Sequence, residues 1–307
     1  MGENMAYTKN VSLKKQLDIS GILFKILLLA PAFVLLVLFL YYPIIETFRL
    51  SFMKADTLGN ETFIGLRNFE RLLTNDDFIA GLIHVFQWAF WSVVLQIPAA
   101  FIISFICITY KTKVINGLRG VFYLSNVIPP VIVTMLGIFL LGPNYGAIKT
   151  FAHAVGWTWI SNIDFLGNPK IAFWSLFALA SWTYMGFGIV YLMANIDQIP
   201  AELFEAALID GANKWQYARH IVIPQIKYAL SVQALLATIG SLKLFDLPWL
   251  LLLGGPGNAT TTLGIELYKE GFINSQYGKG AAIGVVIFLL SLIFSIIQFY
   301  FQKDQKN

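Results

Sequence analysis

The chain has 307 residues, of which 57% are hydrophobic and only 12% are charged, and its formal net charge is +4. Ordinary soluble domains carry about 25% charged residues, so this composition excludes a typical soluble fold and indicates several segments that cross a bilayer. The small, dispersed positive charge excludes the basic footprint of a nucleic-acid-binding protein. The single cysteine, Cys107, excludes an intrachain disulfide, and no cysteine–histidine cluster has the spacing of a metal site.

Six apolar stretches approach the length of about 20 residues that a membrane-spanning helix needs. Backbone groups find no hydrogen-bonding partner in hydrocarbon, so each stretch is expected to be helical. The first is interpreted as a retained helix and not a cleaved signal peptide, because Ala30-Pro31-Ala32 lies within the apolar run and not after it. We therefore predict an all-α integral membrane protein with tails 1–25 and 302–307 and a transmembrane domain 26–301, whose spans are about 26–45, 84–110, 121–141, 171–194, 228–253 and 281–301.

Basic residues indicate the orientation of these spans. They are concentrated in the N-terminal tail, in the loop 195–227 and in the short connection that holds Lys111, Lys113 and Arg119. Short loops rich in lysine and arginine stay in the cytoplasm. Both termini and the loop 195–227 are therefore expected to be cytoplasmic. The longest outer connection, 46–77, is expected to form a small extracellular cap.

The loop 197–226 is expected to contain two short helices. Pro200 suits the first helical position of the first helix, and Glu202 and Glu205 lie near the positive end of its dipole. Gly211 is expected to close this helix in a left-handed conformation.

The second helix of the loop has its own start and stop signals. Asn213 can cap it, with Gln216 in the capping-box position, and Pro224 is expected to end it. Asp210 either caps this helix locally or faces a partner. The whole elbow either projects rigidly from the membrane surface or merely connects two spans.

The elbow resembles a known signature. Glu205-Ala206-Ala207, Asp210-Gly211-Ala212, Ile221 and Pro224 are similar to the EAA motif of permease subunits of binding-protein-dependent ABC importers. Ala218 and Tyr228 depart from it, since phenylalanine and proline are common there. Other segments resemble the sugar-permease branch of the maltose and glycerol-phosphate type, namely Tyr41–Ile44, Phe63–Phe69, Asn126–Pro130, Phe245–Leu247 and Leu253–Pro256.

This resemblance implies a type I ABC importer transmembrane domain in a bacterial cell membrane. Its cargo would be a sugar or oligosaccharide carried by alternating access, with a polyol phosphate or other small solute as the alternative. The implied partners are a second, different permease subunit, two ATPase subunits that bind ATP and magnesium, and an extracytoplasmic solute-binding protein. The implied coupling residues, which would contact the ATPase, are Glu205, Ala206, Ala207, Asp210, Gly211, Ala212 and Pro224.

Resemblance to the maltose-type permease also implies a cargo site. The corresponding positions repeat at i, i+3, i+4 and i+7, which is one face of a helix. Tyr184 and Phe187 could stack on a sugar ring, and Thr183 and Ser241 could bind hydroxyls. The amides usual on such a face are missing from these positions, which are Ala180, Thr183, Tyr184 and Phe187 in the fourth span and Ala237, Gly240, Ser241 and Leu244 in the fifth.

Lys243 and Asp246 are charged residues inside the expected fifth span, where charge is costly. At a spacing of three they can meet on one helix face and neutralise each other, and Pro248 just beyond can kink the helix. They either fix helix packing as an internal pair or line the transport path.

Two other functional classes were weighed. A stand-alone secondary transporter predicts internal repeats or an acidic relay, but no repeat is visible and Asp246 is the only relay candidate. An intramembrane enzyme is disfavoured because His84, His153 and His220 form no HExxH pair and no Gly-x-Ser-x-Gly is present. Gly278-Lys279-Gly280 lacks the upstream glycine and the hydroxyl of a phosphate loop. We expect no catalytic site, metal or cofactor in this chain.

Overall fold

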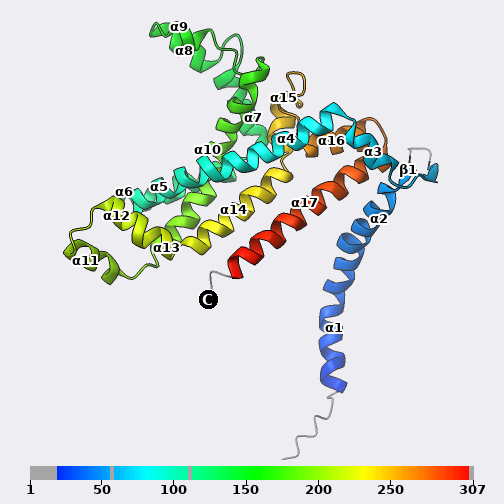
Figure 1. The fold of residues 1–307 in the computed structure, drawn as a ribbon, viewed down its shortest axis with the longest axis horizontal. Coiled ribbons are helices and arrows are strands. Elements are labelled where there is room, and N and C mark those ends of the chain that lie inside the picture. Colours follow the sequence, from blue (N-terminus) through cyan, green and yellow to red (C-terminus); the bar gives the residue numbers. More distant parts are fainter. Residues whose placement is uncertain (1–18, 56–58, 110–112, 304–307) are drawn as a thin grey trace, which may run out of the picture. The chain divides into compact units, whose positions relative to one another are not determined.

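The computed structural model describes residues 19–55, 59–109 and 113–303, and their structure is almost entirely helical (Figure 1). Most of the expected tails 1–25 and 302–307, and Lys111 in the basic connection, lie outside these residues. Contacts divide the chain into two units, up to Thr47 and from Phe48 onward. Each unit is described by itself.

The first unit is one helical run. Helix α1 (Ile19–Leu36), the π-turn η1 (Val37–Tyr41) and α2 (Tyr42–Ser51) follow one another without a break. They include an apolar stretch, Phe24–Ser51, that is long enough to cross a membrane, so the expected first helix is confirmed. Its large apolar side chains are exposed, from Phe24 to Tyr42. Such a surface is stable only where an apolar environment covers it.

The second unit opens with a small folded connection. Strand β1 (Met53–Ala55) pairs antiparallel with β2 (Glu61–Phe63), and α3 (Arg67–Leu73) follows. The buried Asn68 side chain donates hydrogen bonds to the carbonyl oxygens of Ser51 and Met53, at 2.9 and 2.8 Å. The described parts of the connection, 46–55 and 59–77, are therefore folded, as a small cap requires.

The second span is longer than the sequence suggested. Helix α4 (Asp76–Trp91), η2 (Ser92–Gln96) and α5 (Ile97–Thr109) form a continuous run of 34 residues. It begins eight residues before the expected residue 84 because Asn75 caps it, accepting a hydrogen bond from the Phe78 amide at 2.9 Å. Asp76 and Asp77 in the first turn also favour this start.

The third expected span is bent, and the fourth is straight. Helices α6 (Lys113–Val127) and α7 (Pro130–Leu141) meet at 98°, so the prediction of one uniform helix over 121–141 was wrong. Pro129 is extended, with φ −57° and ψ 141°, and Pro130 has no amide hydrogen to continue the helix. After α8 (Ala147–Ala154) and α9 (Thr158–Ser161), the fourth apolar stretch is one helix, α10 (Pro169–Ile196), which is long enough to cross a membrane.

The expected fifth span, 228–253, is broken once, and a sharp bend precedes it. The elbow contains α11 (Ala201–Ile209), α12 (Lys214–Tyr217), η3 (Ala218–Val222) and α13 (Ile223–Gln225), and α14 (Lys227–Leu242) follows at 73°. Helix α14 stops before Lys243, and α15 (Asp246–Leu252) starts anew, so a continuous helix over 228–253 was a wrong expectation.

The last described elements are α16 (Leu263–Tyr268), η4 (Lys269–Ile273) and α17 (Tyr277–Lys303), and α17 holds an apolar stretch long enough to cross a membrane. Glu266 is 3% exposed, and its Oε1 lies 3.4 Å from Lys269 Nζ. Burial raises the pKa of Glu266, while the Lys269 ammonium opposes that shift. Lys279 Nζ lies 3.5 Å from Glu270 Oε2, which ties η4 to α17. Across the described residues, four runs could cross a membrane, or up to six if each bent pair counts as one span.

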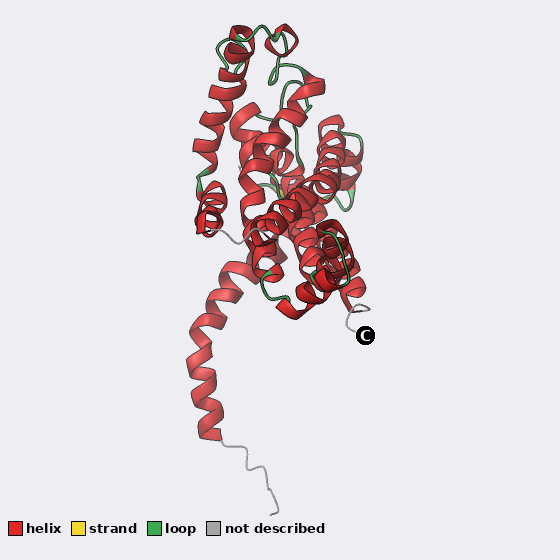
Figure 2. Cartoon of the chain, turned by 90° about the vertical axis from the view of Figure 1, so that its left-hand side faces the viewer, coloured by secondary structure: helices red, strands yellow, loops and turns green. Residues whose placement is uncertain are grey.

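The described residues are almost all helices joined by loops (Figure 2), and helix α10 packs against α5, α6, α7, α14 and α15 of the second unit. Its buried residues contribute to two apolar clusters, one that includes Leu192 and Met193 and one that includes Leu176. It packs against α5 and α6. At Gly186 an added Cβ would overlap the Phe122 carbonyl of α6, so the glycine permits the close approach of these helices.

Candidate functional site

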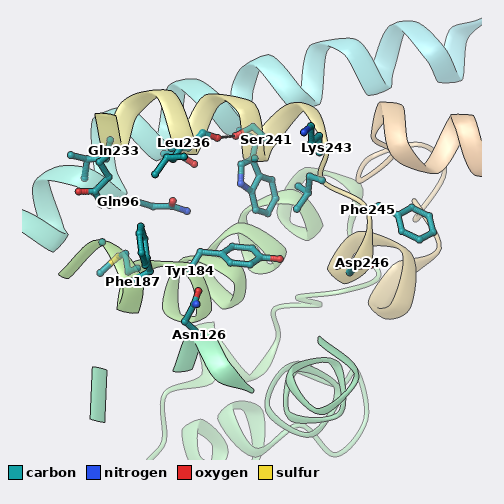
Figure 3. Close-up of a pocket in the computed structure, with 18 residues that line it drawn as sticks. Gln96, Asn126, Tyr184, Phe187, Gln233, Leu236, Ser241, Lys243, Phe245 and Asp246 are labelled. Atoms are coloured by element: carbon teal, nitrogen blue, oxygen red, sulfur yellow. Dashed lines mark hydrogen bonds between the residues drawn. The ribbon is translucent and has the colours of Figure 1, made fainter. Parts of the chain in front are cut away.

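A cavity of about 310 Å³ lies between η2, α6, α10, α14 and the break that follows α14 (Figure 3). Its size falls at the lower end of the range of small-molecule sites, which is about 300–1,000 Å³. Polar and aromatic side chains share its wall. The amides and charged groups are Gln96, Asn126, Gln233, Lys243 and Asp246, and the aromatic rings are Trp88, Tyr184, Phe187 and Phe245.

Most of the cargo residues implied by resemblance do line this cavity. Tyr184 and Phe187 of α10 are 40% and 41% exposed, so their rings are accessible from it. Ser241 is 2% exposed, and its hydroxyl already donates to the Ala237 carbonyl at 2.7 Å. Helix α14 contributes Ala237, Gly240 and Ser241 to the cavity wall, and Leu244, just after the helix, also lines the cavity.

Two of the implied residues lie elsewhere. Ala180 is fully buried in the apolar cluster with Val133 and Leu244. Thr183 is 5% exposed, and its hydroxyl donates to the Leu179 carbonyl at 3.3 Å. The cavity contacts the side of α10 marked by residues 184, 185, 187 and 188, whereas 180 and 183 face neighbouring helices.

The implied positions hold no amide, but three amides reach the cavity wall from other positions. Gln96 lies in η2, Asn126 in α6 and Gln233 in α14. One signal in the sequence could have pointed to these three amides: each is a polar residue inside a stretch that is otherwise apolar enough to cross a membrane. Gln96 and Gln233 are 137 positions apart in the sequence, so the packing of the helices is what brings them to one cavity.

Lys243 and Asp246 do not share a helix face. Lys243 follows the last residue of α14, and Asp246 is the first residue of α15. No ion pair joins the two side chains in the described structure; both are exposed and line the cavity. Pro248 is the third residue of α15, where its missing amide hydrogen breaks no helical bond, so it does not act as a kink.

The first elbow helix ends as expected. Gly211 has φ +74°; its amide donates to the Leu208 carbonyl at 3.1 Å, and the next amide, of Ala212, donates to the Ala207 carbonyl at 2.9 Å. This is a Schellman motif. The helix begins one residue later than expected, because Pro200 is the residue before it and has the extended ψ of 134°.

The predicted capping box is present at the start of the second elbow helix. The Gln216 amide donates to Asn213 Oδ1 at 2.9 Å, and the Asn213 amide donates to Gln216 Oε1 at 2.8 Å. Asp210 therefore does not cap this helix, and it is exposed. Pro224 does not end it either, since the helical run continues to Gln225 and the 73° bend follows.

The elbow presents an exposed surface. Ala207 is 6% exposed and packs inward, and Ala212 is half-buried. Ile209 at 87% and Trp215 at 64% are large, exposed apolar side chains. The other expected coupling residues are exposed around them: Glu205, Ala206, Asp210, Gly211 and Pro224.

Comparison with known proteins identifies the family. Residues 96–307 match the family described as "Binding-protein-dependent transport system inner membrane component". The probable ABC transporter permease protein YurN of Bacillus subtilis (strain 168) is 32% identical over 92% of this chain and 96% of its own length. The probable starch degradation products transport system permease protein AmyD of Thermoanaerobacterium thermosulfurigenes is 30% identical over 91% of this chain and 94% of its own.

The fold has a close counterpart among solved structures. In the crystal structure of a bacterial ABC transporter involved in the import of the acidic polysaccharide alginate, one chain superposes with a TM-score of 0.81. The match covers 94% of this chain and 98% of that one at 22% identity, so the likeness concerns the fold alone. The family match over residues 96–307 and the 32% identity to YurN show that this chain belongs to the family of binding-protein-dependent transport system inner membrane components.

Proposed function

We propose that this chain is a permease subunit of an ABC importer that carries a sugar or oligosaccharide across the cell membrane. The observation that carries the proposal is the cavity, where the accessible rings of Tyr184 and Phe187 stand beside three amide side chains. Rings match the apolar faces of a sugar, and amides match its hydroxyls. Relatives named for trehalose/maltose in Thermococcus litoralis and for arabinooligosaccharides in Bacillus subtilis support this class of cargo. A polyol phosphate is the alternative cargo, as in a relative named for sn-glycerol-3-phosphate in Agrobacterium fabrum.

The proposed path runs through six spans, of which two are the bent pairs. Both termini and the elbow lie in the cytoplasm, and the hairpin of β1 and β2 lies outside. Alternating access would open the cavity first to one side and then to the other. The break between Leu242 and Asp246 supports this view, because it leaves irregular backbone and two charged side chains next to the cavity and not next to lipid.

Energy would arrive through the elbow. Its exposed surface, with Glu205, Asp210 and Ile209, is available to dock on an ATPase subunit. Two ATPase subunits would bind ATP and magnesium, and a second, different permease subunit would complete the path. An extracytoplasmic solute-binding protein would deliver the cargo.

A substitution in the cavity tests the proposal. Tyr184→Ala removes a ring that is 40% exposed, and we expect sugar uptake to fall about ten-fold because ring contacts of this kind contribute about 1–2 kcal/mol. Assembly with the partner subunits and basal ATP hydrolysis should stay unchanged. Radiolabelled sugar uptake, size-exclusion chromatography and phosphate release measure the three quantities.

Two control variants sharpen this experiment. Tyr184→Phe keeps the ring and should retain most of the uptake. Tyr123→Ala removes a tyrosine of similar exposure, 44%, that does not line the cavity, and uptake should be normal. Normal uptake by Tyr184→Ala would remove the cavity as the cargo site. Sugar transport by this chain alone in liposomes without ATP would overturn the importer assignment and favour a secondary transporter.

A further inference from the structure

Three amide side chains surround the cavity although they are far apart in the sequence. Gln96, Asn126 and Gln233 come from η2, α6 and α14, and Figure 3 shows Gln96 and Gln233 above Tyr184 and Asn126 below it. Because they line one cavity, they can contact the same ligand. These positions differ from the ones that the resemblance to maltose-type permeases implied.

The hydrogen-bonding capacity of these amides is largely unused. Gln233 is 9% exposed, and its Oε1 is buried without a hydrogen-bond partner in the described structure. Gln96 donates one hydrogen bond, from Nε2 to Ser181 Oγ at 2.7 Å, which leaves its carbonyl oxygen for a ligand. Buried polar atoms are nearly always paired in proteins, so an unpaired oxygen at a cavity wall indicates a place for a donor group.

The neighbouring helix is shaped around Gln233. A Cβ added at Gly188 of α10 would overlap the Gln233 side-chain amide. With glycine at position 188, the Gln233 amide fits between α10 and α14, whereas an alanine there would force this side chain to move.

The chemistry of the wall selects a class of ligand. An amide both donates and accepts hydrogen bonds, as a hydroxyl group does, and the rings of Tyr184 and Phe187 offer an apolar face. Among the described lining residues, the charges of Lys243 and Asp246 sum to zero, so no net charge attracts an anionic cargo. A neutral, polyhydroxylated ligand matches this wall better than an acid or an apolar solute.

We propose that Gln233, together with Gln96 and Asn126, forms a hydroxyl-binding belt that makes this permease selective for a neutral sugar unit in transit. The inference rests on the proposed function and deepens it, since it assigns specificity to named side chains of the permease. Gln233 is the central member because it is the most buried of the three and carries the unpaired oxygen.

The test uses the complete transporter, with its partner permease, ATPases and binding protein, in proteoliposomes. The probes are radiolabelled maltose, trehalose and an arabino-oligosaccharide, with an alginate oligosaccharide as the acidic probe. Gln233→Leu keeps a similar volume and removes the amide. We expect the number of neutral sugars transported per ATP hydrolysed to fall about five- to ten-fold, as the loss of one or two hydrogen bonds implies. ATP hydrolysis stimulated by the binding protein is measured in parallel, because it is the denominator of this ratio.

Two variants accompany it. Gly188→Ala displaces the same amide without removing it, so the ratio of sugar to ATP should fall in the same way. Thr238→Val is the matched control, because Thr238 lies on the same helix, α14, and outside the cavity lining, and its hydroxyl donates to the Ala234 carbonyl at 2.8 Å. It should keep the wild-type ratio.

The possible results separate the two proposals. Suppose that the wild type transports a neutral sugar and that Gln233→Leu moves as many sugars per ATP hydrolysed as the wild type does. This result overturns the belt but not the proposed function. If Gln233→Leu fails to assemble, Gly188→Ala serves as the test instead. A wild-type number of sugars transported per ATP hydrolysed in Gly188→Ala overturns the belt. A wild-type preference for the acidic probe overturns the neutral class. No ATP-driven transport of any probe by the wild type overturns the proposed function itself.

Discussion

Two glycines in this chain have nearly the same backbone and very different surroundings. Gly211 in the elbow has φ +74° and Gly156 between α8 and α9 has φ +78°, and at both an added Cβ would meet no atom within 4 Å. A side chain at either position is therefore penalised by the left-handed backbone alone, which costs about 1–2 kcal/mol. They form a matched pair in which strain is equal and only the location differs.

This pair tests the elbow at the scale of one residue. Gly211→Ala should weaken the Schellman motif and lower co-purification of the ATPase with the permease about five- to ten-fold, because its strain of about 1–2 kcal/mol opposes the docked conformation. Gly156→Ala should leave co-purification unchanged. Pull-down from detergent extracts, with quantitative immunoblotting of the ATPase, measures both. An equal loss in the two variants would show that general destabilisation, and not the elbow, is responsible.

At the scale of elements, small residues decide which helices can approach. Gly186 brings α10 against the Phe122 carbonyl of α6, and Gly188 two residues on leaves room for the Gln233 amide. The first supports packing and the second shapes the cavity. Positions of α10 that pack against other helices therefore lie next to positions that face the cavity. Hydropathy alone does not distinguish the two kinds.

A larger side chain at Gly186 should separate the two helices. Gly186→Val should destabilise the chain by about 1–3 kcal/mol, the range found for overpacked cores, because the nearest atom is backbone and cannot rotate away. Gly120→Val is the control, since Gly120 lies in α6 and an added Cβ there meets no atom within 4 Å. Thermal unfolding in detergent, followed by size-exclusion chromatography, compares the two. Equal midpoints would contradict the proposed close packing of α6 and α10.

At the scale of the whole molecule, the orientation in the membrane connects the elbow to the ATPase and the outer loops to the binding protein. The chain has a single cysteine, Cys107, which is 6% exposed. Replacing it by alanine gives a background for new cysteines. Tyr145 at 91% exposure and the exposed Asn213 of the elbow are two accessible positions on opposite sides of the proposed topology.

Labelling should distinguish the two sides. In Cys107→Ala cells, Tyr145→Cys should react with a membrane-impermeant maleimide added outside, and Asn213→Cys should react only after the membrane is opened. The reason is that short basic connections remain in the cytoplasm. Gel shift of the labelled chain measures the reaction. Labelling of Asn213→Cys in intact cells would reverse the proposed orientation and remove the elbow from the ATPase side.

Local signals in the sequence by themselves determined much of this structure. Asn213 with Gln216, and Gly211 after the first elbow helix, behave as predicted because their hydrogen bonds close within a few residues. Hydropathy located the apolar helices for a similar reason, since backbone groups in lipid must pair within the segment. The family resemblance of the elbow was readable from contiguous residues.

Only the tertiary structure decided how the long-range features combine. It ended α14 at Leu242 and so separated Lys243 from Asp246, it turned Thr183 away from the cavity, and it brought Gln96, Asn126 and Gln233 together. The physical reason is that the direction of each side chain depends on which helices pack against its own. That packing is set by distant residues such as Gly186 and Gly188, whose effect no local pattern contains.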